Sequence, residues 1–187
     1  MVKRRERLSP DEYFMRIAQA VRLRANCLGS LVGAVLVQNG RIISTGYNGT
    51  PDGMENCEDG GCHRCSHRED YVSGTSYDVC ICVHAEQNAL LSAARVGVAV
   101  AGAEIYTTMR PCFGCTKELV QARVQILHFL HDWRHPNEEF QSEYRRLQAK
   151  INLARVDVDD PELEAVEAPL SDSTANDHEP IGTPEDS

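Results

Sequence analysis

The sequence predicts a single α/β domain in which helices cover both faces of a sheet. From residue 32 onward, short runs rich in β-branched residues alternate with longer amphipathic segments, an order typical of a sheet layered with helices. The 187 residues are enough for one hydrophobic core but too few for two comfortable domains. No apolar run approaches the roughly 20 residues that a membrane-spanning helix requires.

The first part of the chain predicts a helix followed by a β-hairpin. A helix is expected over residues 9–25, because a Ser-Pro pair followed by two acids is typical of a helix start and an apolar stripe follows it. Two β-rich runs, 32–37 and 41–47, flank the dipeptide Asn39-Gly40. This dipeptide between two strands is the strongest short-range signal for a hairpin.

The rest of the domain alternates helices and strands after one long loop. Residues 48–79 are rich in Gly, Asp, His and Cys and show no periodicity. A loop of this length is uncommon in a compact domain unless it is functional or pinned, and its cysteines suggest how it is pinned. Beyond it, helices are expected at about 83–95, 111–122 and 136–150, and strands at 104–108, 126–130 and 151–156.

The charge distribution separates a folded part from an acidic tail. The net charge is −9, but 11 of the 28 acidic residues and none of the 19 basic ones lie after Val156. Residues 1–156 therefore carry a net charge of +2 and are expected to form the domain. Residues 157–187, rich in Pro, Ser, Asp and Glu, are expected to be a disordered acidic tail.

The N-terminal residues and the eight cysteines together indicate in which cellular compartment the protein is expected. The basic N-terminus is not followed by an apolar segment, so no secretory signal is expected and the default location is the cytoplasm. Thiols stay reduced there, so the cysteines are expected to be metal ligands rather than disulfides.

Two short motifs form a candidate catalytic metal site. His84 stands at the start of one predicted helix, and Cys112 and Cys115 stand at the start of another. Unpaired N–H groups at helix starts favour thiolate and hydroxide. One histidine and two cysteines leave the fourth position of a tetrahedral zinc ion open for water, as in catalytic rather than structural sites.

Glu86 completes this motif as a candidate proton carrier. It lies two residues beyond His84, beside the expected water and not on the metal. Zinc lowers the pKa of bound water to around 7, and a neighbouring carboxylate can take that proton and deliver it elsewhere. The pattern H-x-E…P-C-x-x-C is the known signature of zinc nucleobase deaminases. The alternative is a structural zinc knot with Glu86 as an ordinary surface acid.

Beyond this signature, the chain resembles the deoxycytidylate (dCMP) deaminase family over about residues 8–150. The matching stretches are Tyr13-Phe-Met-Arg-Ile-Ala18, Val32-Gly-Ala34, Arg41-Ile-Ile-Ser-Thr-Gly-Tyr-Asn-Gly49, His84-Ala-Glu-Gln-Asn-Ala89, Gly102-Ala-Glu-Ile-Tyr-Thr107 and Pro111-Cys-Phe-Gly-Cys115. The resemblance implies a cytidine-deaminase-like fold, a three-layer α/β/α arrangement around a five-stranded mixed sheet. It implies conversion of dCMP to dUMP for thymidylate synthesis. It also implies a homo-oligomer, often a hexamer, activated by dCTP with Mg²⁺ and inhibited by dTTP.

The resemblance also implies substrate contacts. Family members use the asparagine matching Asn48 in nucleotide binding; the alternative is that Asn48-Gly49 is merely a turn. They place an aromatic residue near the substrate where this chain has Trp133, for which half-buried packing is the alternative. Arg110 departs from the family pattern, where an uncharged residue usually precedes Pro-Cys, and is a candidate phosphate clamp. The basic residues open for the phosphate contact are Arg22, Arg24, Arg110, Lys117 and Arg134.

Six further cysteines suggest a second, structural zinc ion. By resemblance to dCMP deaminases that carry one, its ligands are expected to be Cys27, Cys57, Cys65 and Cys82. Cys62 and Cys80 are the alternatives to Cys65. His63 and His67 are weaker candidates. Such an ion would pin the long loop to the domain; the alternative is a set of free buried thiols.

Functions of other classes remain open from the sequence alone. A tRNA or other polynucleotide deaminase should show a basic groove, which the near-neutral domain and acidic tail disfavour, so nucleic acid is not an expected partner. A nucleoside deaminase would need no phosphate site. A non-catalytic zinc scaffold would have no reason to keep Glu86.

Overall fold

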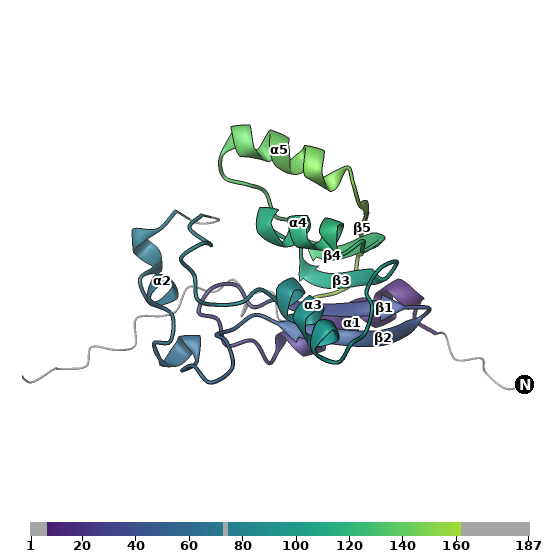
Figure 1. Ribbon diagram of the computed structural model, residues 1–187, viewed down its shortest axis with the longest axis horizontal. Helices are drawn as coiled ribbons and strands as arrows, with labels where there is room; N and C mark the ends of the chain where they lie inside the picture. The colour runs from purple at the N-terminus through teal and green to yellow at the C-terminus, as the bar shows by residue number, and fades with distance from the viewer. Residues whose placement is uncertain (1–6, 73–74, 162–187) are drawn as a thin grey trace, which may run out of the picture.

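The computed structural model, which describes residues 7–72 and 75–161, is a three-layer α/β/α domain around one mixed sheet (Figure 1). The sheet has five strands in the order β2-β1-β3-β4-β5. Strand β1 is antiparallel to β2 and to β3, whereas β3, β4 and β5 are parallel. The fold class and the five-stranded mixed sheet expected from the sequence are therefore confirmed.

The observed elements follow the expected order. The strands are β1 (Gly33–Gln38), β2 (Arg41–Tyr47), β3 (Glu104–Met109), β4 (Ile126–His131) and β5 (Asn152–Arg155). The longer helices are α1 (Pro10–Arg22), α3 (Ala85–Arg95), α4 (Phe113–Gln121) and α5 (Glu138–Gln148). The expected turn between β1 and β2 is also present, since Asn39 and Gly40 both have positive φ angles of 51° and 70°.

Strand β1 shows why the sheet is covered on both faces. Its residues are almost all buried, and they alternate between two separate hydrophobic clusters. Ala34 and Leu36 pack with residues of α3 and α4, whereas Val35 and Val37 pack with residues of α1. Because successive side chains of a strand point to opposite faces, a continuous apolar run needs a helix layer on each side.

Two glycines let the covering helices approach the sheet closely. A Cβ atom on Gly33 would lie 2.2 Å from the Ala18 carbonyl oxygen of α1. A Cβ atom on Gly46 would lie 2.2 Å from the Ala85 carbonyl oxygen of α3, on the other face. Helix α3 is therefore held directly against the end of β2 by a contact that any larger residue would prevent.

The strand directions gather four chain segments at one edge of the sheet. Because β1 is antiparallel to both neighbours, β2 runs in the same direction as β3, β4 and β5. The segments that follow these four strands therefore leave from the same edge. Three of them contain residues that the sequence analysis assigns to the site, namely Asn48, Cys112 and Trp133.

The long segment between β2 and α3 contains short helices, which the sequence analysis did not expect. They are η1 (Cys57–Asp59), α2 (His63–Ser66) and η2 (Arg68–Asp70). The segment extends to one side of the sheet (Figure 1). Its own buried cluster consists largely of cysteine side chains, so the expectation of a segment pinned by its cysteines agrees with the packing.

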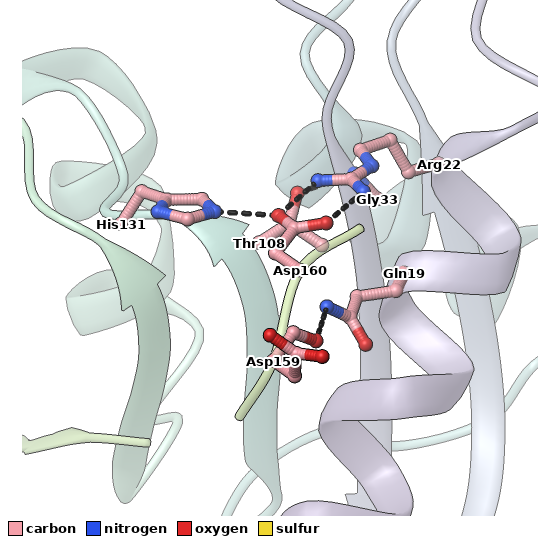
Figure 2. Close-up of polar contacts among 7 residues, drawn as sticks. All are labelled: Gln19, Arg22, Gly33, Thr108, His131, Asp159 and Asp160. Carbon is pink, nitrogen blue, oxygen red and sulfur yellow. Dashed lines mark hydrogen bonds and ion pairs between the residues drawn. The ribbon is translucent and has the colours of Figure 1, made fainter. Parts of the chain in front are cut away.

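The beginning of the expected tail packs against the domain. Val158 lies against the cluster under α1, and Asp160 forms an ion pair with Arg22 and a hydrogen bond with His131 (Figure 2). The prediction of disorder from residue 157 is therefore wrong for 157–161, because a buried arginine 138 residues earlier in the chain requires a carboxylate partner. The rest of the predicted tail, residues 162–187, lies outside the described residues.

Among the described residues, no helix is long and apolar enough to cross a membrane.

Candidate functional site

Helices α3 and α4 bring His84, Cys112 and Cys115 together at their N-terminal ends. His84 and Cys112 are the N-cap residues of the two helices, and Cys115 lies in the first turn of α4. The Nδ1 atom of His84 lies 3.5 Å from Sγ of Cys112 and 3.3 Å from Sγ of Cys115. The structure thus places the three predicted catalytic-metal ligands in one cluster.

The spacing of these three donors fits a zinc ion. In a tetrahedral site with a Zn–N distance of about 2.05 Å and a Zn–S distance of about 2.3 Å, nitrogen and sulfur ligands lie about 3.6 Å apart. The two N–S distances are close to this value. Three protein donors leave one tetrahedral position for water or substrate, which is the arrangement of catalytic zinc sites.

A side-chain bridge holds the two ligand-bearing helices in register. The His84 main-chain N–H donates to Oε1 of Gln87 over 3.0 Å, and Nε2 of Gln87 donates to Oε1 of Glu118 on α4 over 2.9 Å. Asn88 donates to the Tyr47 carbonyl oxygen at the end of β2. The histidine and the two cysteines are therefore positioned by rigid elements on both sides.

The three donors are electrostatically coupled to one another. The hydrogen bond from the Cys115 thiol lowers the pKa of Cys112 to about 4, while the pKa of Cys115 is raised. Burial by itself lowers the pKa of His84, but the hydrogen bond and charge of Cys112 outweigh it and raise that pKa to about 9. At least one thiolate is thus formed at neutral pH, as metal binding requires.

Glu86 is buried beside this cluster. Its side chain is only 4% exposed, and burial raises its pKa to about 7. A surface acid has no reason for such burial, so the reading of Glu86 as an ordinary exposed residue is wrong. A carboxyl group whose pKa lies near neutral can both accept and donate a proton, which is the property of a general acid–base catalyst.

Tyr77 lies at the site, although no sequence motif indicated it. Its ring meets the His84 ring edge-on, with 5.0 Å between centroids. Burial and then the charge of Cys112 raise the pKa of Tyr77, and a hydrogen bond with Trp133 opposes this shift. The long segment between β2 and α3 thus contributes an aromatic side chain to one side of the site.

Trp133 lies near the cluster, as expected from its place after β4. It is half-buried, contacts Tyr77, and packs edge-on against Tyr144 of α5 at 5.2 Å between centroids. Tyr144 in turn donates a hydrogen bond to the Pro111 carbonyl oxygen, next to the ligand Cys112. Trp133 is therefore both a packing residue and a residue at the site.

Asn48 is buried at the end of β2 and bonds to the main chain. Its Oδ1 accepts from the Val32 N–H over 2.7 Å, and its Nδ2 donates to the Ser30 carbonyl oxygen over 2.8 Å. These bonds fix the segment that leads into β1. They are the bonds of a structural side chain, and the nucleotide-binding role of Asn48 stays a prediction.

Arg110 is engaged within the protein. It donates to Asp132 over 2.8 Å and to Gln148 of α5 over 2.7 Å, and its guanidinium group lies over the Phe129 ring. A phosphate contact would require Arg110 to exchange these partners, so its role as a clamp stays a prediction.

The structure reduces the number of other basic residues that could contact the substrate phosphate. Arg22 is 1% exposed and paired with Asp160, so it is not available, whereas Arg24, Lys117 and Arg134 are exposed. Arg64, which the sequence analysis did not consider, lies over the Tyr77 ring at 5.3 Å. Its Nε atom is buried without a hydrogen-bond partner among the described residues.

The six remaining cysteines also come together. All eight cysteines of the chain are free thiols. The four predicted structural ligands, Cys27, Cys57, Cys65 and Cys82, form one set of donors that lie within 4.8 Å of one another. The exposed His63 and His67 rings lie against each other at an angle of 37° and are not part of this set.

Comparison with known proteins places this geometry in a family. Residues 8–131 match the family model described as the cytidine and deoxycytidylate deaminase zinc-binding region. The deoxycytidylate deaminase of Schizosaccharomyces pombe is 44% identical over 65% of this chain and 37% of its own length. The chain therefore spans less than two fifths of that relative.

Two other relatives align over more of their length. The ComE operon protein 2 of Bacillus subtilis is 35% identical over 83% of this chain and 75% of its own. The dCMP deaminase of cyanophage S-TIM5, solved in complex with dCMP and dUMP, has 27% identity and a TM-score of 0.60. That comparison covers 80% of this chain and all of the phage chain.

Proposed function

The chain belongs to the family of zinc-binding cytidine and deoxycytidylate deaminases, and from this premise we propose that it converts dCMP to dUMP by zinc-dependent hydrolytic deamination, releasing ammonia. The observation that carries the proposal is Glu86, buried beside the donor set of His84, Cys112 and Cys115. Relatives named deoxycytidylate deaminase, and a structural neighbour solved with dCMP and dUMP, support the choice of substrate.

The residues of the site divide the chemistry between them. A zinc ion held by His84, Cys112 and Cys115 would supply a water molecule that loses its proton near neutral pH. Glu86 takes that proton and delivers it to the ring nitrogen next to the carbon that is attacked. The water oxygen bonds to that carbon, and Glu86 then moves the remaining proton of this oxygen to the amine. The C–N bond breaks, the oxygen becomes the carbonyl of the product base, and ammonia departs. Tyr77 and Trp133 shield this exchange from bulk water and offer ring faces to the base.

The test of this function is an ammonia-release assay on the purified zinc protein. We expect turnover of dCMP to exceed that of CMP and deoxycytidine, because relatives are named deoxycytidylate deaminase and a structural neighbour was solved with dCMP and dUMP. Faster turnover of deoxycytidine would favour a nucleoside deaminase. No turnover of any of the three, with zinc bound, would favour another base or a zinc scaffold.

Regulation, assembly and location stay parts of the proposal. Membership of the family leads us to expect activation by dCTP with Mg²⁺, inhibition by dTTP, a homo-oligomer such as a hexamer, a role in supplying thymidylate synthesis, and a cytoplasmic location. The same assay with each effector, and light scattering with and without it, test the first three.

We also propose that Arg64 contacts the substrate phosphate. Its guanidinium group lies over the Tyr77 ring, and its buried Nε atom has no hydrogen-bond partner within the part of the chain that the structure describes, although Nη2 donates to the Thr75 carbonyl oxygen. Replacing Arg64 with Ala should raise the KM for dCMP about tenfold or more, the worth of a charge-assisted hydrogen bond. The KM of any residual deoxycytidine turnover should not change. Arg68→Ala, an exposed arginine of the same segment, is the matched control.

A structural zinc ion on Cys27, Cys57, Cys65 and Cys82 is the last part of the proposal. The cluster of these four thiols supports it. An ion there would tie three chain segments together just ahead of the ligand His84 and would hold Tyr77 at the site.

A further inference from the structure

The six cysteines outside the catalytic site form two sets of four donors, not one. The first set is Cys27, Cys57, Cys65 and Cys82. The second set is Cys62, Cys65, Cys80 and Cys82, again with all sulfur atoms within 4.8 Å of one another. The two sets share Cys65 and Cys82.

Three sulfur–sulfur distances, one in the first set and two in the second, have the length of a tetrahedral edge. Four thiolates at about 2.3 Å from one zinc ion lie about 3.8 Å from each other. Cys27 and Cys65 are 3.8 Å apart in the first set. In the second set, Cys62 and Cys80 are 3.8 Å apart, and Cys65 and Cys80 are 3.7 Å apart. These distances are too long for disulfide bonds, whose sulfurs lie about 2.05 Å apart.

We propose that the six thiolates hold two zinc ions, each with two ligands of its own and with Cys65 and Cys82 bridging both. One ion then has Cys27 and Cys57 as its own ligands, and the other has Cys62 and Cys80. A single ion would leave two of these thiols without a metal although they are gathered at the same spacing. One zinc ion with four thiolates and two zinc ions with six thiolates carry the same formal charge, so the second ion adds no net charge to the buried cluster.

Main-chain hydrogen bonds and a tight turn hold the cysteines of this cluster in place. The main-chain N–H of Leu28 points at Sγ of Cys57, and that of Gly29 points at Sγ of Cys27, both over 3.3 Å. Such bonds orient thiolate ligands and spread their charge. Gly61 allows the tight turn between Cys57 and Cys62, since a Cβ atom there would lie 1.9 Å from the Glu55 carbonyl oxygen.

The cluster has a structural consequence for the active site. Its ligands come from the segment after α1, from η1 and α2, and from the two cysteines just before His84. Two ions therefore join the whole long segment to the start of α3. They stabilise a segment whose buried cluster consists largely of cysteines and not of larger apolar side chains. The inference extends the structural zinc proposed above, but it does not depend on deaminase activity.

Metal counting tests the proposal on the full chain, purified reduced with zinc in the medium. Mass spectrometry under non-denaturing conditions should find three zinc ions per chain, one of them catalytic. The variant His84→Ala/Cys112→Ser/Cys115→Ser, which lacks the catalytic ligands, should keep two. Two ions in the original protein, or one in this variant, would overturn the proposal.

Two single substitutions test the arrangement of ligands. Cys27→Ser and Cys62→Ser should each release at least one zinc ion, because each thiol is a ligand of a different ion. With one ion only, one of these two variants would keep the full metal content, and that result would contradict the bridged cluster. His63→Ala, an exposed potential ligand beside Cys62, should retain three ions and serves as the control.

Substitution with ¹¹³Cd supplies a readout that does not depend on variants folding. Two resonances in the range of four-sulfur coordination, split by each other through the bridging sulfurs, are expected. A single such resonance would exclude the second ion.

Discussion

Replacing Glu86 with Gln should lower the turnover of dCMP about a thousandfold and leave zinc content and stability nearly unchanged. The glutamine has the same shape and can occupy the same buried position, which is only 4% exposed. It cannot carry a proton, and positioned proton transfer contributes typically about 10²- to 10⁴-fold to a rate. Ammonia release, metal counting and thermal unfolding on the same preparation measure the three quantities.

Glu118→Gln is the matched control for this substitution. Glu118 is an exposed acid on α4 that accepts a hydrogen bond from Gln87 near the same ligands. We expect this variant to keep most of its activity, since an amide oxygen can still accept that bond. If Glu86→Gln lost zinc and unfolded, the carboxylate would be structural and the reading as a zinc scaffold would gain support.

The second large effect is expected at Asp160, on the other face of the sheet. Its carboxylate pairs with Arg22 through two bonds of 2.6 and 2.8 Å and accepts a third bond of 2.6 Å from His131 (Figure 2). The side chains of Arg22 and Asp160 are 1% and 4% exposed. Asp160→Asn would leave a buried guanidinium without a counter-charge, which costs about 3–5 kcal/mol in unfolding free energy.

Urea unfolding at neutral pH measures this loss. Asp159→Asn is the matched control, because the side chain of Asp159 is exposed and the bond that Gln19 donates goes to its main-chain oxygen, not to its side chain. The control should change the unfolding free energy by less than about 0.5 kcal/mol. An equal effect of both substitutions would show that the ion pair contributes nothing specific.

The contribution of Asp160 should also depend on pH. The bonds from Arg22 and then from His131 hold the pKa of Asp160 far below its usual range. As the pH falls, the unfolded chain therefore binds a proton at this group before the folded chain does. The stability difference between the original protein and Asp160→Asn should be constant above about pH 5 and should shrink below about pH 4. A difference that grew on acidification would contradict the assignment.

Local signals in the sequence were sufficient for most of the secondary structure. The strand at 41–47 is observed with the predicted bounds, and the turn at Asn39-Gly40 is where the dipeptide indicated. The helices expected from 83 and 111 begin instead at Ala85 and Phe113. The difference has a physical meaning, because it makes His84 and Cys112 N-cap residues, just outside each helix, where their donor atoms can converge.

Contacts between residues far apart in the sequence could not be predicted from local patterns. The sequence left Arg22 among the candidates for the phosphate contact and predicted a disordered tail from residue 157, because nothing local links Arg22 to Asp160. Tyr77 and Arg64 reach the site from a segment without periodicity, whose path is fixed by its cysteines. The bonds of Arg110 to Asp132 and Gln148 likewise join three separate segments.

The sequence by itself determined the fold class, the family and the candidate catalytic donors, because these depend on short-range patterns: the period of apolar residues, the turn dipeptide and the spacing of His84, Glu86, Cys112 and Cys115. Only the tertiary structure decided that Glu86 is buried, that Arg22 is paired with Asp160, and that six cysteines form two sets sharing two sulfurs. Burial, ion pairing and shared ligands depend on distances between segments far apart in the chain, and those distances are set by how the whole domain packs.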